Sequence, residues 1–211
     1  MSGEKAVNKI KRNKGHIFIS GITQSGKTYF SIHLAKKWEG PVLYFNSNDV
    51  NITGLTKANK RSQIEVMQMA LNKDRKINYI PDPEPEKAKK EIKTIVNSLL
   101  AGQDFSKGKK NDLLVVCDEV HEFDSEVSFI AKRGLGRGIK GCFISQTPAD
   151  VSKSIVKQCS YHVIFRFNVY DSKYLQSYSI PADELDKKHE QGGKYSFCVF
   201  DNQDLYGPYK I

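Results

Sequence analysis

Eight consecutive residues combine glycines, hydroxyl groups and a lysine in an order suited to holding phosphate. Glycines at both ends let the backbone approach a polyphosphate closely, and exposed N–H groups at a helix start attract its negative charge. Lys27 can reach the outer phosphates, and the hydroxyl of Thr28 can bind Mg²⁺. An apolar run, residues 16–20, precedes these residues and a helical pattern follows them. The sequence therefore predicts a phosphate-binding loop made of Gly21, Ile22, Thr23, Gln24, Ser25, Gly26, Lys27 and Thr28.

A second stretch that could take part in a reaction is residues 113–119, an apolar run that ends in Asp118 and Glu119. A central parallel strand has this pattern when its carboxyl end faces a nucleotide. Asp118 is suited to the hydration shell of Mg²⁺, and Glu119 to polarising the water that attacks the γ-phosphate. His121 follows closely, and the sequence leaves open whether it carries protons or only packs.

A third candidate is Gln146, which follows the short apolar run 141–145 and precedes Thr147-Pro148. A side-chain amide at a strand end can donate to a γ-phosphate or to the attacking water while it accepts from a partner. We therefore expect Gln146 to report which nucleotide is bound.

These candidate residues need a framework of alternating strands and helices. Short apolar runs and helical periodicity predict alternating strands and helices that end in a C-terminal β-hairpin. The expected strands are 16–20, 42–45, 76–80, 113–117, 141–145 and 161–167, and the hairpin is 195–200 and 205–211. The expected helices are 27–38, 60–72, 86–101, 125–133 and 149–158, followed by two short segments around Pro181.

The chain length of 211 residues suits one domain, which we place at residues 15–211. Residues 1–14 are rich in lysine and are expected to be a basic arm that is mobile or loosely docked. The loop at 102–112 is expected to be flexible and basic. Residues 132–140 predict a glycine-rich basic loop for phosphate contact.

The composition indicates a globular chain with a basic surface. Lys and Arg number 33 against 24 acids, giving a formal net charge of +9, which fits a polyanionic partner and equally a solvated lysine-rich surface. The four scattered cysteines are expected to be buried free thiols. No apolar run approaches the ~20 residues of a membrane span, and the start of the chain does not read as a signal peptide. We therefore expect an intracellular protein that is not secreted.

Taken in order, residues 21–28, residues 113–123 and residues 143–148 resemble the HerA/FtsK superfamily of DNA-pumping ATPases. Because it is small, the chain is most similar to the genome-packaging ATPases of viruses with internal membranes, including archaeal icosahedral viruses. The resemblance covers about residues 14–167, and its most specific feature is the amide of Gln146 coupled to Asp118 and Glu119.

The resemblance implies an α/β phosphate-loop fold of the additional-strand catalytic-glutamate (ASCE), RecA-like type, a three-layer sandwich with a mostly parallel central sheet. It places the strand bearing Asp118 and Glu119 beside the phosphate-loop strand. It implies a ring, a hexamer in the family, that threads double-stranded DNA, with ATP and Mg²⁺ bound at subunit interfaces. Glu119 would be the base, Gln146 the sensor, and Thr28 and Asp118 the metal-binding residues. An arginine from the adjacent subunit would complete each site, with Arg137 ranked before Arg133. A capsid or portal-vertex protein would be a further partner, in the host cytoplasm or the virion.

Other classes of phosphate-loop protein share the loop. A filamentous-phage-type assembly ATPase shares the loop and the small size but usually carries a membrane segment. A GTP-binding switch needs a guanine-reading Asn-Lys-x-Asp, which residues 72–75 do not provide. A P-loop nucleotide kinase stays possible from the loop alone, although Glu119 with Gln146 suits attack by water better.

Overall fold

A nine-stranded mixed sheet forms the centre of the computed structural model, which describes residues 3–13, 15–58, 65–66, 75–104 and 112–211. The strand order is β3-β4-β2-β5-β6-β1-β7-β8-β9. Neighbouring strands from β3 to β7 are parallel, and the last two pairs are antiparallel. The strands are β1 His16–Ser20, β2 Val42–Phe45, β3 Thr56–Ala58, β4 Lys76–Tyr79, β5 Leu113–Cys117, β6 Ile139–Ser145, β7 Cys159–Phe165, β8 Phe197–Phe200 and β9 Leu205–Tyr209.

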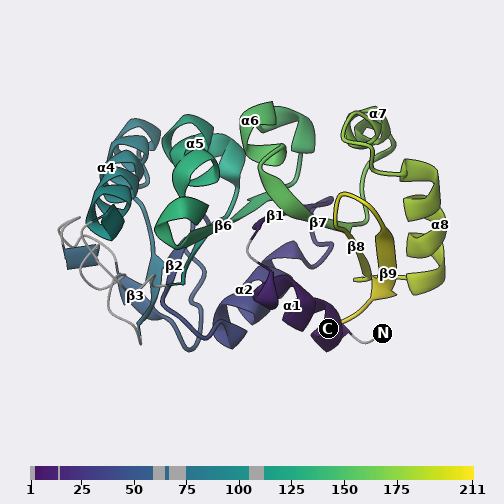
Figure 1. The fold of residues 1–211 in the computed structure, drawn as a ribbon, viewed down its shortest axis with the longest axis horizontal. Helices are drawn as coiled ribbons and strands as arrows, with labels where there is room; N and C mark the ends of the chain where they lie inside the picture. The colour runs from purple at the N-terminus through teal and green to yellow at the C-terminus, as the bar shows by residue number, and fades with distance from the viewer. Residues whose placement is uncertain (1–2, 14, 59–64, 67–74, 105–111) are drawn as a thin grey trace.

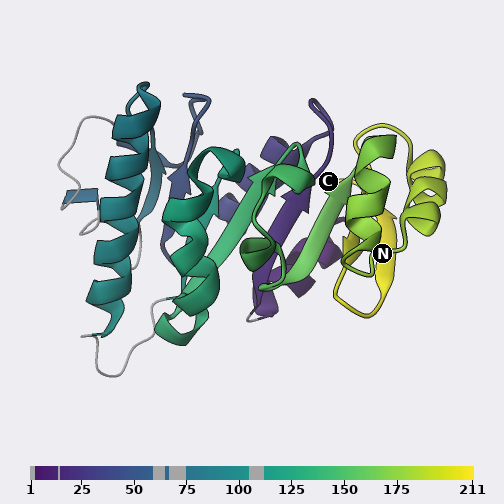
Figure 2. The same ribbon diagram turned by 90° about the horizontal axis from the view of Figure 1, so that it is seen from above.

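Helices cover both faces of this sheet, which gives three layers (Figure 1). One face carries α4, α5 and α6, and α4 and α5 run side by side across it (Figure 2). The opposite face carries α1 and α2, and α7 and α8 lie near the β8–β9 hairpin. The helices are α1 Gly3–Arg12, α2 Lys27–Lys37, α4 Pro85–Asp104, α5 Asp124–Arg133, α6 Lys153–Val156, α7 Ser172–Gln176 and α8 Ala182–Gly192.

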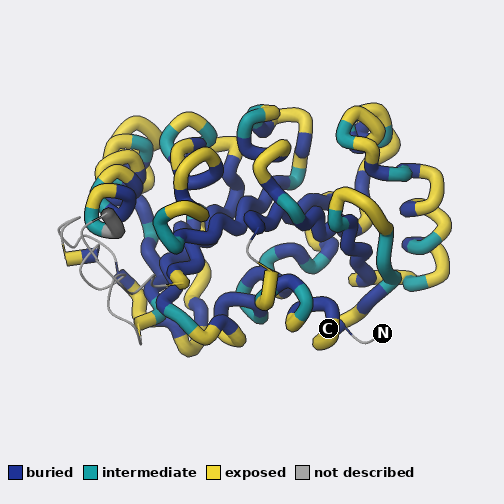
Figure 3. Tube along the Cα trace, viewed as in Figure 1, coloured by how far each residue is buried: buried dark blue, intermediate teal, exposed yellow. Residues whose placement is uncertain are grey.

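The sheet is apolar on both sides because each face packs against helices. Every residue of β1, β2, β5 and β6 is buried, and the burial of the central strands is visible in Figure 3. Such strands appear in a sequence as continuous apolar runs rather than as alternating patterns. The predicted fold class, a mostly parallel sheet with a C-terminal hairpin, is confirmed.

Most predicted elements are found within a few residues of the expected positions. The short edge strand β3 was not anticipated. The expected helix over 149–158 is wrong, because the chain forms a 3₁₀ turn at Pro148–Asp150 and then the short α6. The helix expected at 60–72 lies mostly outside the described residues, as does most of the basic connection at 102–112.

The strand next to the phosphate-loop strand differs from the expectation. β1 pairs with β6 and β7, and β5 pairs with β6 and β2, so β6 lies between the strand before the loop and the strand before Asp118. The expectation that the Asp118 strand sits beside β1 is therefore wrong. The inserted strand is β6, which ends directly before Gln146 and so places an amide between the loop and the carboxylates.

The N-terminal segment is also a correction. Residues 3–12 form α1, and its apolar side chains Ala6, Val7 and Ile10 are buried in the core beneath the sheet. The expectation of a mobile or loosely docked arm is wrong, because charges on one side of this helix accompany an apolar stripe on the other.

Lys140, expected in a phosphate-contacting loop, is instead a buried residue of β6. Its Nζ donates to the backbone carbonyls of Ile10 and Asn13 at 2.6 and 2.7 Å. A cation at the end of a helix satisfies carbonyls that have no intrahelical partner and opposes the helix dipole. Lys140 therefore fastens the end of α1 to the sheet.

The four cysteines are buried and free, as predicted. Across the described residues, none of the helices combines the length and the apolar character that a membrane crossing requires.

Candidate active site

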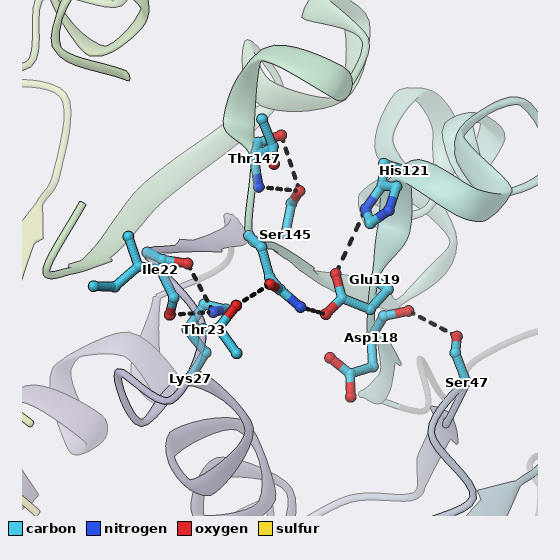
Figure 4. A network of polar contacts seen from close by, with 11 residues as sticks. Ile22, Thr23, Lys27, Ser47, Asp118, Glu119, His121, Ser145 and Thr147 are labelled. Atoms are coloured by element: carbon cyan, nitrogen blue, oxygen red, sulfur yellow. Dashed lines mark hydrogen bonds and ion pairs between the residues drawn. The ribbon is translucent and has the colours of Figure 1, made fainter. Parts of the chain in front are cut away.

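The three candidate stretches meet at one edge of the sheet. β1, β5 and β6 are parallel, so the segments that follow them emerge at their common carboxyl edge. Ser20 of β1 is in register with Ser145 of β6, which brings the start of the loop beside Gln146. Figure 4 shows Thr23 and Lys27 of the loop facing the side of the site that carries Asp118 and Glu119.

The loop has the backbone of a phosphate cradle. Gly21 and Gly26 have φ of 147° and 109°, values that residues with a side chain rarely adopt. A Cβ on Gly21 would lie 2.6 Å from Cβ of Phe165, so the loop packs directly against β7. The hydroxyl of Ser25 is buried and has no hydrogen-bond partner among the described residues. With α2 starting at Lys27, the loop fits a bound polyphosphate.

Lys27 lies over this cradle. Its Nζ donates to the carbonyls of Gly21 and Ile22 at 2.7 and 2.8 Å, which holds the ammonium at the mouth of the loop. Burial lowers the pKa of Lys27, and the nearby carboxylates of Glu119 and Asp118 oppose that shift. The lysine is thus a cation placed between backbone carbonyls and two acids, where it can meet a phosphate.

Asp118 is the more buried of the two acids, with 2% of its surface exposed. Burial, together with the neighbouring Glu119, raises the pKa of Asp118 to about 6. A carboxylate that is costly to ionise gains from a cation, and Mg²⁺ is usually held in nucleotide sites by one or two protein oxygens plus the phosphates. Asp118 and the hydroxyl of Thr28 provide oxygens of this kind.

Gln146 connects the loop to the carboxylate of Glu119. Its Nε2 donates to Oε1 of Glu119 at 2.5 Å, and its Oε1 accepts from the hydroxyl of Thr23 at 2.5 Å. We call this the Thr23–Gln146–Glu119 bridge. The three residues come from three separate segments of the chain, so the bridge exists only because β6 lies between β1 and β5.

The second oxygen of Glu119 faces His121. The distance from Oε2 to Nδ1 of His121 is 3.5 Å, and Oε2 makes no hydrogen bond within the described part of the chain. Glu119 itself has a left-handed backbone with φ of 48°, uncommon for a residue with a side chain, and such conformations concentrate at functional sites. The carboxylate therefore has one oxygen fixed by an amide and one available to a proton-bearing group such as water.

Sequence reasoning missed two features that shape this site. Thr23 was expected only as a loop residue, and nothing in the motif indicated its bond to Gln146. The loop after β2 also contributes: the hydroxyl of Ser47 donates to the backbone carbonyl of Asp118 at 3.2 Å. Behind it, the buried amides of Asn46 and Asn78 are joined at 3.0 Å. The polar run at 46–51 after an apolar strand was the available signal.

The two candidate arginines are not brought to this edge. Arg133 ends α5, and Arg137 ends the 3₁₀ turn Leu135–Arg137 just before β6, at the amino end of that strand. The seven residues of β6 span about 23 Å at the usual rise per residue. The guanidinium of Arg137 donates to the carbonyl of Leu100. Both arginines thus lie at the edge of the sheet opposite this chain's own loop.

Comparison with solved structures gives matches over almost the whole chain. The genome-packaging NTPase B204 from Sulfolobus turreted icosahedral virus 2, in complex with ATP-γS, has 14% sequence identity and a TM-score of 0.67 over 94% of this chain and 98% of that chain. B204, the DNA-packaging ATPase from Sulfolobus turreted icosahedral virus, has 15% identity and a TM-score of 0.65 over 95% and 99%.

A weaker likeness is found to the cytoplasmic domain of EssC, with 14% identity and a TM-score of 0.51 over 78% of this chain and 35% of that chain. No family model and no curated protein sequence matches the chain. At such low identity the likeness concerns the fold. The chain therefore has the phosphate-loop ATPase fold of the viral packaging NTPase B204 over nearly its full length.

Proposed function

We propose that this chain is an ATP-hydrolysing motor that translocates double-stranded DNA, with packaging of a viral genome into a preformed capsid as its role. The observation that carries the proposal is the Thr23–Gln146–Glu119 bridge, which ties a carboxylate suited to activating water to the phosphate loop. A strand-end amide held in this way can respond to the terminal phosphate of a nucleotide. The fold shared with B204 supports the same function.

In this proposal residues 21–28 bind the phosphates of ATP, and Thr28 and Asp118 would hold Mg²⁺. Mg²⁺ would neutralise charge that develops on the transferred phosphoryl group. Glu119 positions and deprotonates the attacking water, and Lys27 binds the terminal phosphates. Because Gln146 fixes one oxygen of Glu119, Oε2 is the oxygen that faces the water.

Duplex DNA is proposed as the polymer because the chain carries a net charge of +9. Contacts to the phosphate backbone are electrostatic and largely independent of sequence, as a translocating motor requires. Lys57 in β3 is a described candidate, although it pairs with Asp49 at 2.9 Å. Lys60, Arg61 and the basic run 106–110 lie outside the described residues.

A ring of subunits is proposed from the position of the arginines. Arg137 and Arg133 lie at the edge of the sheet away from their own loop, so they can complete only the site of another subunit. An arginine supplied in trans is worth about 10³ to 10⁵ in rate in related phosphoryl transfers. A test is to mix Arg137→Ala subunits with Glu119→Gln subunits. Partial recovery of hydrolysis is expected, because the two lesions can fall at different interfaces. No recovery at any mixing ratio argues against an arginine that acts in trans.

The primary test is steady-state ATP hydrolysis with and without long double-stranded DNA. Glu119→Gln keeps the shape of the side chain and is expected to lower turnover at least about 100-fold, the usual contribution of a general base. Glu122→Gln is the matched control, because Glu122 is an exposed acid in the following turn and its substitution removes the same charge.

The two parts of the proposal fail separately. Stimulation by duplex DNA that disappears at high salt supports a DNA motor. Hydrolysis that ignores DNA removes the translocation part, and transfer of phosphate to a nucleoside identifies a nucleotide kinase instead. Equal turnover of Glu119→Gln and Glu122→Gln removes Glu119 from the role of base.

A further inference from the structure

The candidate catalytic residues lie on one side of the phosphate-loop strand β1. Glu119 and Gln146 follow β5 and β6, which lie on one side of β1. The terminal phosphate of a nucleotide must face these residues for water to attack it. The nucleoside end then leaves the loop on the opposite side of β1, toward β7 and β8.

Tyr195 stands at that side of the loop. β8 begins at Phe197, which pairs with Phe165 at the carboxyl end of β7, so Tyr195 lies at the same edge of the sheet as the loop. A Cβ built on Gly26 would be 3.8 Å from Cδ1 of the tyrosine. The ring therefore stands against the end of the phosphate loop that is next to α2.

Core packing does not explain this tyrosine. The neighbouring rings of Phe30, Phe165 and Phe197 form a buried cluster, whereas Tyr195 remains 54% exposed. Its φ of 63° is left-handed, which costs a bulky residue about 1 kcal/mol or more. A large aromatic side chain that is neither buried nor conformationally favoured has a use outside folding.

The surroundings of the ring suit a nucleotide. Nζ of Lys194 lies over the Tyr195 ring, 4.8 Å from its centroid, which adds a positive charge beside the ring. An exposed aromatic face beside a phosphate cradle offers stacking to a purine base, and stacking tolerates any base because every base has a π-face.

We propose that Tyr195 is the platform on which the base of the bound nucleotide stacks. The proposal rests on the proposed function, since it requires that residues 21–28 bind a nucleoside triphosphate. It assigns the β8 side of the site to the nucleoside and the β6 side to the reacting phosphate.

Calorimetric titration with two ligands tests this assignment: AMPPCP, which carries the base, and tripolyphosphate, which lacks it. Tyr195→Gly removes the ring and also relieves the left-handed backbone, so the protein is expected to stay folded. Its Kd for AMPPCP is expected to rise at least about fivefold, and its Kd for tripolyphosphate to change less than about twofold. Tyr195→Phe keeps the ring and is expected to restore AMPPCP binding. Asn202→Gly is the control, a left-handed residue in the turn at the other end of β8.

Each other outcome overturns the assignment. If Tyr195→Gly leaves AMPPCP binding unchanged while the unaltered protein prefers AMPPCP to tripolyphosphate, the base is held elsewhere and the proposed function stands. If the variant weakens both ligands equally, Tyr195 shapes the loop rather than the base site. If the unaltered protein binds neither ligand, the proposed function and the base platform fall together.

Discussion

The Thr23–Gln146–Glu119 bridge makes a quantitative prediction about coupling between the loop and the base. Gln146→Leu removes the donor to the Glu119 carboxylate, a hydrogen bond to a charged group that is worth about 1.5–3 kcal/mol. If this energy is lost in the transition state, kcat falls about 10- to 150-fold. Thr23→Val removes only the neutral bond from the hydroxyl to the amide, worth about 0.5–1.5 kcal/mol, so kcat falls about 2- to 12-fold.

The double variant separates a bridge from two independent contacts. Thr23 reaches Glu119 only through Gln146, so Thr23→Val should add little once Gln146→Leu is present. Steady-state hydrolysis of ATP by all four proteins at saturating ATP and Mg²⁺ measures the cycle. Gln146 is partly exposed, so a melting curve serves to verify that each variant is folded. Effects on log kcat that simply add would refute the bridge as a coupled unit, and so would an unchanged rate in Gln146→Leu.

Two further predictions concern stability. Lys140→Met leaves the carbonyls of Ile10 and Asn13 without their donor, so the free energy of unfolding in urea should fall by about 2 kcal/mol, and an unchanged midpoint would contradict the role given to Lys140. Burial lowers the pKa of His16 and of His162 to about 4. Because the unfolded chain has a histidine pKa near 6.5, it binds more protons between pH 6.5 and 4, and acid favours unfolding. Each histidine should lower the free energy of unfolding by about 2 kcal/mol when the pH falls from 7 to 5. The variant His162→Phe should lose less stability on acidification than the unaltered protein. An equally steep dependence of stability on pH in that variant would exclude His162 as a source of the acid sensitivity.

The sequence was informative wherever a property is local. Glycine spacing, a preceding apolar run and a following helix are all found within the segment from β1 to α2, and the structure has them at the expected residues. The acids after β5 and the amide after β6 were found for the same reason. Each is a strand end that can be recognised without knowing its neighbours.

The order of the strands in the sheet could not be predicted from local sequence patterns. β1 and β6 are neighbours in the sheet but are separated by more than a hundred residues, and no local pattern states which of two buried strands lies beside β1. The apolar runs of β5 and β6 are interchangeable in that respect. The bond between Thr23 and Gln146 follows from strand order, so it was missed with it.

The N-terminal helix shows a different kind of error. The lysines of this segment indicate an exposed arm, whereas the spacing of Ala6, Val7 and Ile10 indicates a helix with a buried side. Lys140 is a second case. A lysine beside glycines suggests an anion as its partner, but Lys140 donates to backbone carbonyls near the N-terminus. In both cases the position of a lysine depends on which atoms pair with it and not on its charge alone.

The direction of the bridge follows from the chemistry of its ends. A carboxylate can only accept hydrogen bonds, so the amide of Gln146 must present Nε2 to Glu119. Its Oε1 then faces the loop and accepts the proton of the Thr23 hydroxyl. The hydroxyl has one proton, so a phosphate oxygen that took it would leave Oε1 of Gln146 without a donor. Two hydrogen bonds therefore connect the loop to the carboxylate of Glu119.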